Sequence, residues 1–127
     1  LNQAILIADY ILNHPNLPED KIPYWDFDAP NIPDALRDAS AGAVISSALF
    51  ELADYSEGEQ ATLYRDNAIQ MMESLANDYQ AEPGTNGGFI LEHSVGHLMA
   101  DSEVDVPLTY ADYYYLEAIK RYKALKN

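Results

Sequence analysis

The segment that most restricts the fold is residues 34–55, because it carries apolar or small side chains on every side of a helix. Its apolar stripe consists of Ala41, Val44, Ile45, Ala48, Leu49 and Leu52. Its other side consists of Gly42, Ala43, Ser46, Ser47 and Phe50. A helix that is apolar or small all round is normally buried on most sides. We therefore expect other helices to surround this segment.

Three further segments have apolar residues at helical spacing. Residues 1–12 form the first, which ends at Asn13-His14-Pro15. Residues 56–79 form the next, and Ser56 with Glu59 predicts a capping box at its start. Residues 108–124 form the last. Basic residues fall in or after its final turn, where cations complement the helix dipole, namely Lys120, Arg121, Lys123 and Lys126.

The connections between these helices are unequal in length. A tight turn joins the second helix to the third. Residues 14–33 contain five of the seven prolines, and residues 80–107 are rich in glycine, with one short strand or an extended segment expected at residues 89–91. Since consecutive antiparallel helices alternate in direction, both long loops fall at the same end, the N-terminal end of the buried helix. The sequence thus predicts an all-α fold of antiparallel helical hairpins with two long loops on one face, where loops of such length are usually functional.

Composition excludes several classes of function. The chain has 127 residues, of which 21 are acidic and 7 basic, for a net charge of -14. This charge argues against nucleic acid and anionic membrane surfaces as partners. No apolar run is long enough for a membrane-spanning helix. Because cysteine is absent, thiol catalysis and cysteine-ligated metals are excluded too.

The first long loop carries aromatic residues among carboxylates, at Trp25, Asp26, Phe27 and Asp28. This mixture suits a sugar, which presents an apolar ring face together with hydroxyls. The alternative is that Trp25 and Phe27 pack the loop onto the core while the acids cap backbone amides. Arg37, just before the buried helix, is able to contact an anion or to form an ion pair with Asp28 or Asp38.

The second long loop carries His93, Ser94 and His97. The two histidines have the spacing of a metal-binding pair, but they lie in a glycine-rich loop without a third ligand at an accepted spacing, so no metal is expected. Asp101, Glu103, Asp105 and Asp112 match part of a calcium-loop register, although the required glycine is replaced by Val106. Helix capping and solvated charge explain these acids better. No cofactor is indicated.

Several longer motifs resemble one enzyme family. Residues 24–30 (YWDFDAP), 37–41 (RDASA), 91–97 (LEHSVGH), 102–108 (SEVDVPL) and 110–118 (YADYYYLEA) stand in order and at matching separations. Together they resemble the C-terminal part of the unsaturated glucuronyl hydrolases, glycoside hydrolase family 88. Paired carboxylates are the minimum for acid-catalysed glycoside cleavage, and spacing alone selects no such pair here.

The resemblance implies an (α/α)6 barrel of six helical hairpins, of which residues 1–127 would be the C-terminal part. Members of the family remove a Δ4,5-unsaturated uronic acid from the non-reducing end of lyase-generated, glycosaminoglycan-type oligosaccharides, by acid-catalysed hydration of the enol ether. The catalytic aspartates of the family lie upstream of these motifs, so we expect no catalytic residue in this chain. His93, Ser94, His97, Trp25 and Arg37 are the expected substrate-binding residues.

These expectations describe a piece of a longer enzyme. The isolated chain is expected to be inactive and to self-associate through exposed barrel edges, while the complete barrel binds the unsaturated uronyl oligosaccharide. A bacterial cytoplasm or periplasm would fit the family. Two alternatives stay open: a fragment of an unsaturated rhamnogalacturonyl hydrolase, which shares the barrel, and a non-catalytic acidic helical interaction module.

Overall fold

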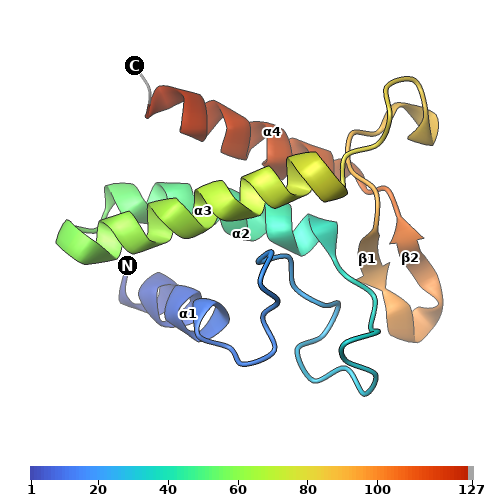
Figure 1. The fold of residues 1–127 in the computed structure, drawn as a ribbon, viewed down its shortest axis with the longest axis horizontal. Helices are drawn as coiled ribbons and strands as arrows, with labels where there is room; N and C mark the ends of the chain where they lie inside the picture. Colours follow the sequence, from blue (N-terminus) through green and yellow to red (C-terminus); the bar gives the residue numbers. More distant parts are fainter. Residues whose placement is uncertain (126–127) are drawn as a thin grey trace.

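The computed structural model describes residues 1–125, and Lys126 of the basic cluster lies outside them. Four helices make up most of the chain: α1 (Asn2–Leu12), α2 (Ala39–Asp54), α3 (Gly58–Asp78) and α4 (Thr109–Ala124). The prediction of an all-α fold built from antiparallel hairpins is confirmed. The α2 and α3 helices form a hairpin, and α4 lies against α2 and runs in the same direction (Figure 1).

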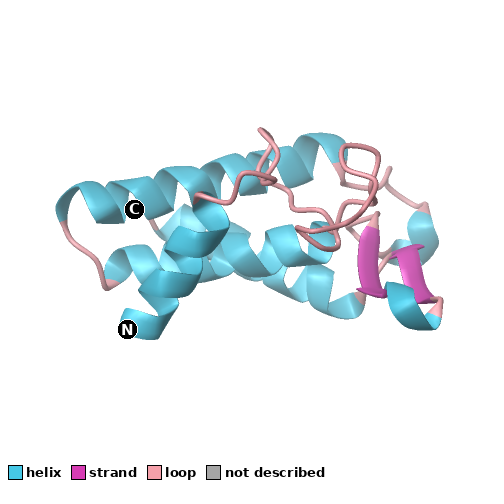
Figure 2. Cartoon of the chain, turned by 90° about the horizontal axis from the view of Figure 1, so that it is seen from below, coloured by secondary structure: helices cyan, strands magenta, loops and turns pink. Residues whose placement is uncertain are grey.

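Both long loops lie at one end of the helices, beside the starts of α2 and α4, as Figures 1 and 2 show. The tight turn between α2 and α3 lies at the opposite end, as expected. The second loop is more ordered than predicted. It contains an antiparallel pair of strands, β1 (Ser94–His97) and β2 (Ser102–Val106), and two 3-10 turns, η1 (Asn86–Gly88) and η2 (Leu98–Ala100).

Of the two alternatives for residues 89–91, the strand does not form, because only Leu91 pairs, in an isolated bridge with Gln80. The extended alternative agrees with the structure at Phe89, whose backbone is extended. Pairing takes place instead further along, where Val95 and Val104 face each other across the hairpin. The Asp112 carboxylate of α4 accepts hydrogen bonds from the backbone N–H groups of Ile90 and Leu91, at 2.8 and 2.9 Å. Those groups are therefore satisfied without a second strand.

The start of α2 and the start of α3 also differ from prediction. The α2 helix begins at Ala39, after Asp38, whose side chain accepts from the Ser40 N–H. Residues 34–38 are not helical, because residues 34 and 35 form a bend and Arg37 pairs with Tyr24 of the preceding loop in an isolated bridge. The capping box was wrong, since the Ser56 hydroxyl donates to the Leu52 carbonyl at the end of α2 and Glu57 is the residue that precedes α3.

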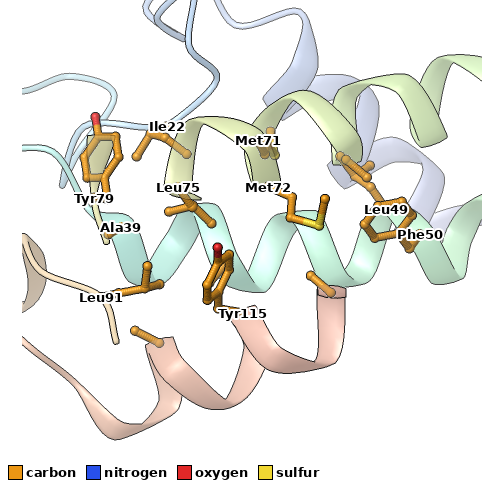
Figure 3. Close-up of a cluster of buried hydrophobic side chains, with 14 of the residues drawn as sticks. Ile22, Ala39, Leu49, Phe50, Met71, Met72, Leu75, Tyr79, Leu91 and Tyr115 are labelled. Carbon is orange, nitrogen blue, oxygen red and sulfur yellow. The ribbon is translucent and has the colours of Figure 1, made fainter. Parts of the chain in front are cut away.

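The core lies between α2, α3 and α4 (Figure 3). Its larger members include Tyr64, Met71 and Leu75 of α3, Tyr115 of α4, and Ile22 and Leu91 from the two loops. The side of α2 that faces this core is the one with small residues, including Gly42, Ala43, Ser46 and Ser47. Small side chains let two other helices approach α2 closely, and the Ser46 hydroxyl donates to the Ala68 carbonyl of α3 at 2.9 Å.

The apolar stripe of α2 is less buried than its pattern suggested. Val44 and Ile45 are half-buried and Ala48 is exposed. They line an open groove between α1 and α2, which has a volume of about 290 Å³. The rest of its lining is apolar too and consists of Ala4, Ile7, Ala8, Ile11, Leu49 and Leu52. Leu49 and Leu52 of the same stripe are buried. The prediction of burial on most sides of α2 therefore holds for its small side and for only part of its apolar stripe.

Candidate functional site

A hollow of about 350 Å³ opens where the two long loops meet the end of α3. Its lining comes from three parts of the chain, namely Ala35, Leu36 and Arg37 before α2, Asp78 and Tyr79 at the end of α3, and His93 and Asp105 of the hairpin region. Two of the five expected substrate-binding residues, Arg37 and His93, therefore lie in one hollow although 56 positions separate them in the sequence.

Arg37 is held by three contacts. Its Nε–H donates to the Ile22 carbonyl at 2.9 Å, its guanidinium forms an ion pair with Asp20, and it lies 5.0 Å from the centre of the Tyr24 ring. The expected partners Asp28 and Asp38 were wrong. Asp28 is exposed on the loop, and Asp38 accepts hydrogen bonds from the Ser40 N–H and hydroxyl and from the Val95 N–H.

Tyr79 forms one wall of the hollow. Its hydroxyl donates to Asp20 Oδ2 at 3.1 Å, and its ring stands edge-on to His93, with 6.4 Å between ring centres. Burial raises the pKa of Tyr79 strongly, the Arg37 cation opposes this, and Asp20 adds to it. Tyr79 is therefore a neutral hydrogen-bonding group at physiological pH.

His93 lies beside two carboxylates. Its Nδ1 is 2.7 Å from Asp105 Oδ1, and its Nε2 is 3.9 Å from Glu92 Oε2. About half of the His93 side chain is exposed. Neither Tyr79 nor Asp105 was among the expected site residues. Tyr79 was expected only as the end of the helix of residues 56–79, and Asp105 appeared only within the motif of residues 102–108 and in the calcium register.

The other three expected residues lie outside the lining of the hollow. Ser94 is completely buried, and its hydroxyl has no hydrogen-bond partner among the described residues. His97 is exposed at the end of β1. Trp25 is half-buried against the small cluster of Tyr24, Ala29 and Ala35, as the packing alternative predicts, and its backbone N–H donates to the Leu36 carbonyl beside the hollow.

Residues 1–125 contain neither a cluster of metal ligands nor a helix that could span a membrane. Within residues 1–125, no group of three or more His, Asp or Glu side chains could hold a metal ion. The acids of the calcium register are used elsewhere, since Asp112 binds two backbone N–H groups and Asp105 pairs with His93. Among the described helices, none has the length and apolar character required to cross a bilayer.

Two known proteins match most of the chain in sequence. The unsaturated glucuronyl hydrolase of Formosa agariphila is 46% identical over 122 residues, which are 95% of this chain and 30% of that protein. The unsaturated glucuronyl hydrolase of Bacillus sp. (strain GL1) is 36% identical over 109 residues, or 83% of this chain and 28% of that protein. No protein-family model matches the chain.

Solved structures match in fold as well. An unsaturated glucuronyl hydrolase specific for heparin superimposes with a TM-score of 0.94 at 51% identity, covering 98% of this chain and 33% of that one. The glycosaminoglycan-degrading enzyme from Bacillus sp. GL1 superimposes with a TM-score of 0.88 at 27% identity, covering 96% of this chain and 32% of that one. The chain thus spans about a third of the length of these relatives.

The fold and these matches together define a class, the glycoside hydrolases with an α/α barrel, of which this chain supplies part of one barrel. Within that class the chain belongs to the unsaturated glucuronyl hydrolases. The family contains solved complexes with unsaturated oligosaccharides, among them one with dGlcA-GalNAc6S and one with dGlcA-Glc-Rha-Glc.

Proposed function

We propose that this chain is the C-terminal part of an unsaturated glucuronyl hydrolase barrel. The complete protein would remove a Δ4,5-unsaturated uronic acid from the non-reducing end of glycosaminoglycan-type oligosaccharides, by acid-catalysed hydration of the enol ether. The observation that supports this most is the 46% identity to a relative over 95% of the chain, a range that includes every residue of the hollow.

The proposal separates what the chain does alone from what the complete protein does. Four helices are about a third of a ring of six hairpins, and the relatives are about three times longer. In the hollow, Asp105 pairs with His93, and Asp20 pairs with Arg37 beside it. The isolated chain is therefore proposed to be inactive, with the catalytic acids supplied by the rest of the barrel.

The test is an assay of the complete protein and of this chain in parallel. Unsaturated heparin and chondroitin disaccharides are followed by the loss of absorbance of the conjugated double bond. We expect turnover by the complete protein and none by the chain. Turnover of an unsaturated rhamnogalacturonan disaccharide alone would replace the proposal by its nearest alternative, and no turnover of any substrate would favour a non-catalytic module.

We infer that Arg37 and His93 contact the sugar in the hollow, with Trp25 and His97 beside it and Ser94 acting from within the fold. Replacing His93 by Gln in the complete protein should raise KM about tenfold, the equivalent of one hydrogen bond worth about 1.4 kcal/mol. His14→Gln is the matched control and should leave KM unchanged, because His14 stacks on Phe27 and does not line the hollow. An equal effect of both variants would contradict this assignment.

We infer further that the isolated chain self-associates through the open edge of the barrel. The groove between α1 and α2 has an apolar lining, and Leu6, Ile7 and Tyr10 are exposed on α1. Large apolar patches are rare on stable monomers. The groove is the surface that another hairpin would cover in the complete barrel, and in the isolated chain a second copy would cover it.

Sedimentation at several concentrations tests this inference. We expect the sedimenting mass of the chain to increase with concentration. The increase should be smaller for Ile7→Lys, because this variant places a charge in the groove. Leu63→Lys is the control, because Leu63 is exposed on α3 and does not line the groove. A monomer at every concentration would contradict self-association.

A further inference from the structure

The contact between His93 and Asp105 depends on an irregularity in the β1–β2 hairpin. Ser94 pairs with Val106 and Val95 pairs with Val104, so Asp105 is the extra residue of a β-bulge. Its φ is +53°, a left-handed conformation typical of bulges. A bulge turns one side chain away from the regular strand pattern, and here it places the Asp105 carboxylate 2.7 Å from His93 Nδ1.

The partner residue is held in an unusual conformation too. His93 has a φ of +60°, which costs free energy for a residue with a Cβ atom. Its carbonyl is fixed, because it accepts a hydrogen bond from the N–H of Ala39 at 3.0 Å, at the first turn of α2. Two left-handed residues that meet through a short hydrogen bond, at the rim of a hollow, are an arrangement typical of functional sites.

We propose that Asp105 is a positioning residue that fixes the tautomer of His93. An ionised carboxylate only accepts hydrogen bonds, so the nitrogen that faces it, Nδ1, must carry the proton. In the neutral ring, Nε2 is then unprotonated and is an acceptor. No hydrogen bond involves Nε2 within the described residues, since Glu92 Oε2 is 3.9 Å away.

This tautomer determines what the hollow recognises. With Nδ1 engaged, His93 offers the hollow an acceptor at Nε2, which suits the hydroxyl group of a sugar. The carboxylates of Asp78, Asp105 and Glu92 lie around His93 and repel an anionic group of a ligand at this point. The inference therefore rests on the proposed function in its choice of ligand, a neutral hydroxyl, whereas the tautomer follows from the geometry alone.

The three histidines of the chain provide their own references in an imidazole 15N NMR experiment on the neutral rings. His93 is expected as the Nδ1–H tautomer. His14 is expected as the opposite tautomer, because its Nδ1 accepts from the Asn16 N–H at 3.2 Å. His97, exposed at the end of β1, is expected to show a mixture.

Two variants and a control isolate the carboxylate. Asp105→Gly suits the left-handed backbone and removes the acceptor, so His93 should change to a mixture like that of His97. Asp105→Asn keeps a carbonyl acceptor and should retain the Nδ1–H form. Asp101→Gly is the matched control, since Asp101 is also exposed, acidic and left-handed, with a φ of +50°, and should change nothing at His93.

The outcomes are distinct. A protonated Nε2 on His93 in the unmodified chain, or no change in Asp105→Gly, would overturn the inference. The unmodified chain alone decides the first point even where Asp105→Gly disturbs the hairpin. Addition of an unsaturated heparin disaccharide to the complete protein should shift the Nε2 resonance of His93. If that shift is missing while the tautomers are as expected, the sugar site is wrong and the role of Asp105 is still supported.

Discussion

Arg37 shows how one side chain serves both the fold and the candidate site. Its guanidinium joins Asp20 and Ile22 of the first loop to the segment before α2, and it stacks on Tyr24. Only the planar guanidinium of arginine makes several such contacts at once. The donor that would face a sugar is therefore fixed in place by the same contacts that close the first loop.

Arg37→Lys should lower the free energy of unfolding by about 1–2 kcal/mol, because lysine keeps the charge but loses the Nε–H bond to Ile22. Urea denaturation measures the effect. Arg121→Lys is the control, since Arg121 makes ion pairs with Glu51 and Glu117 near the surface, where such pairs contribute little. Equal losses in the two variants would show that the contact with Ile22 is unimportant.

Asp112 connects α4 to the segment before the hairpin. Its two carboxylate oxygens accept from the N–H groups of Ile90 and Leu91. Asp112→Ala should cost about 2–3 kcal/mol, because it leaves the N–H of the buried Leu91 without its partner. Asp112→Asn, which retains one acceptor oxygen, should cost less. The midpoint of urea unfolding ranks the stability of the unmodified chain and the two variants. An alanine variant as stable as the asparagine variant would show that the hydrogen bond retained by asparagine does not contribute to stability.

At the level of the helices, the two sides of α2 should respond differently to a larger side chain. Ala43 is completely buried, so Ala43→Leu should cost about 1–3 kcal/mol by overpacking the contact with its neighbours. Ala48 is exposed beside the groove, so Ala48→Leu should be close to neutral. Both substitutions have the same helix propensity change, so thermal unfolding of the pair compares packing alone. A similar loss in both would show that the groove is closed in solution.

The helices could be predicted because apolar residues at helical spacing mark them directly. The small side of α2 and the stripe of α3 are examples, and four of the four expected helices exist. The β1–β2 hairpin could not be predicted in the same way. Apolar alternation along it is limited to Val104 and Val106 of β2, which is too short to mark a strand, and three acidic residues have positive φ, Asp101 in the turn and Glu103 and Asp105 in β2.

The candidate site could be predicted only in part, for a related reason. His93, Arg37 and Asp105 belong to motifs that are recognisable in the sequence, but these motifs do not show which residues meet. Tyr79 and Asp105 are brought into the hollow by the end of α3 and by a β-bulge. Contacts that depend on a bulge or on the meeting of two loops leave no periodic signal along the chain.

Considered as a whole, the molecule is one part of a helical ring, with an open apolar edge and a strongly acidic composition. Its core holds three tyrosines, Tyr64, Tyr79 and Tyr115, whose pKa values are all raised, mainly because burial disfavours the charged phenolate. They come from α3, the end of α3 and α4, so their ionisation affects the packing that unites the helices.

These tyrosines predict the response of the whole chain to alkaline pH. The ordinary pKa of tyrosine is about 10, and each of the three has a higher pKa in the folded chain, so above about pH 10 the unfolded state loses protons that the folded state retains. Stability is then complete below about pH 10 and falls as pH rises toward the folded-state values, by about 1.4 kcal/mol per pH unit for each tyrosine.

Tyr115→Phe separates this effect from general base denaturation. At pH 7 the variant should lose less than about 1 kcal/mol, because the Tyr115 hydroxyl makes only a long hydrogen bond to Gln80, at 3.3 Å. Above pH 10 its stability should fall less steeply than that of the unmodified chain, so that the two urea midpoints converge or cross. Because Tyr64 and Tyr79 remain, some decline persists in the variant. Parallel curves of the two proteins between pH 9 and 12 would show that Tyr115 does not take part in alkaline unfolding.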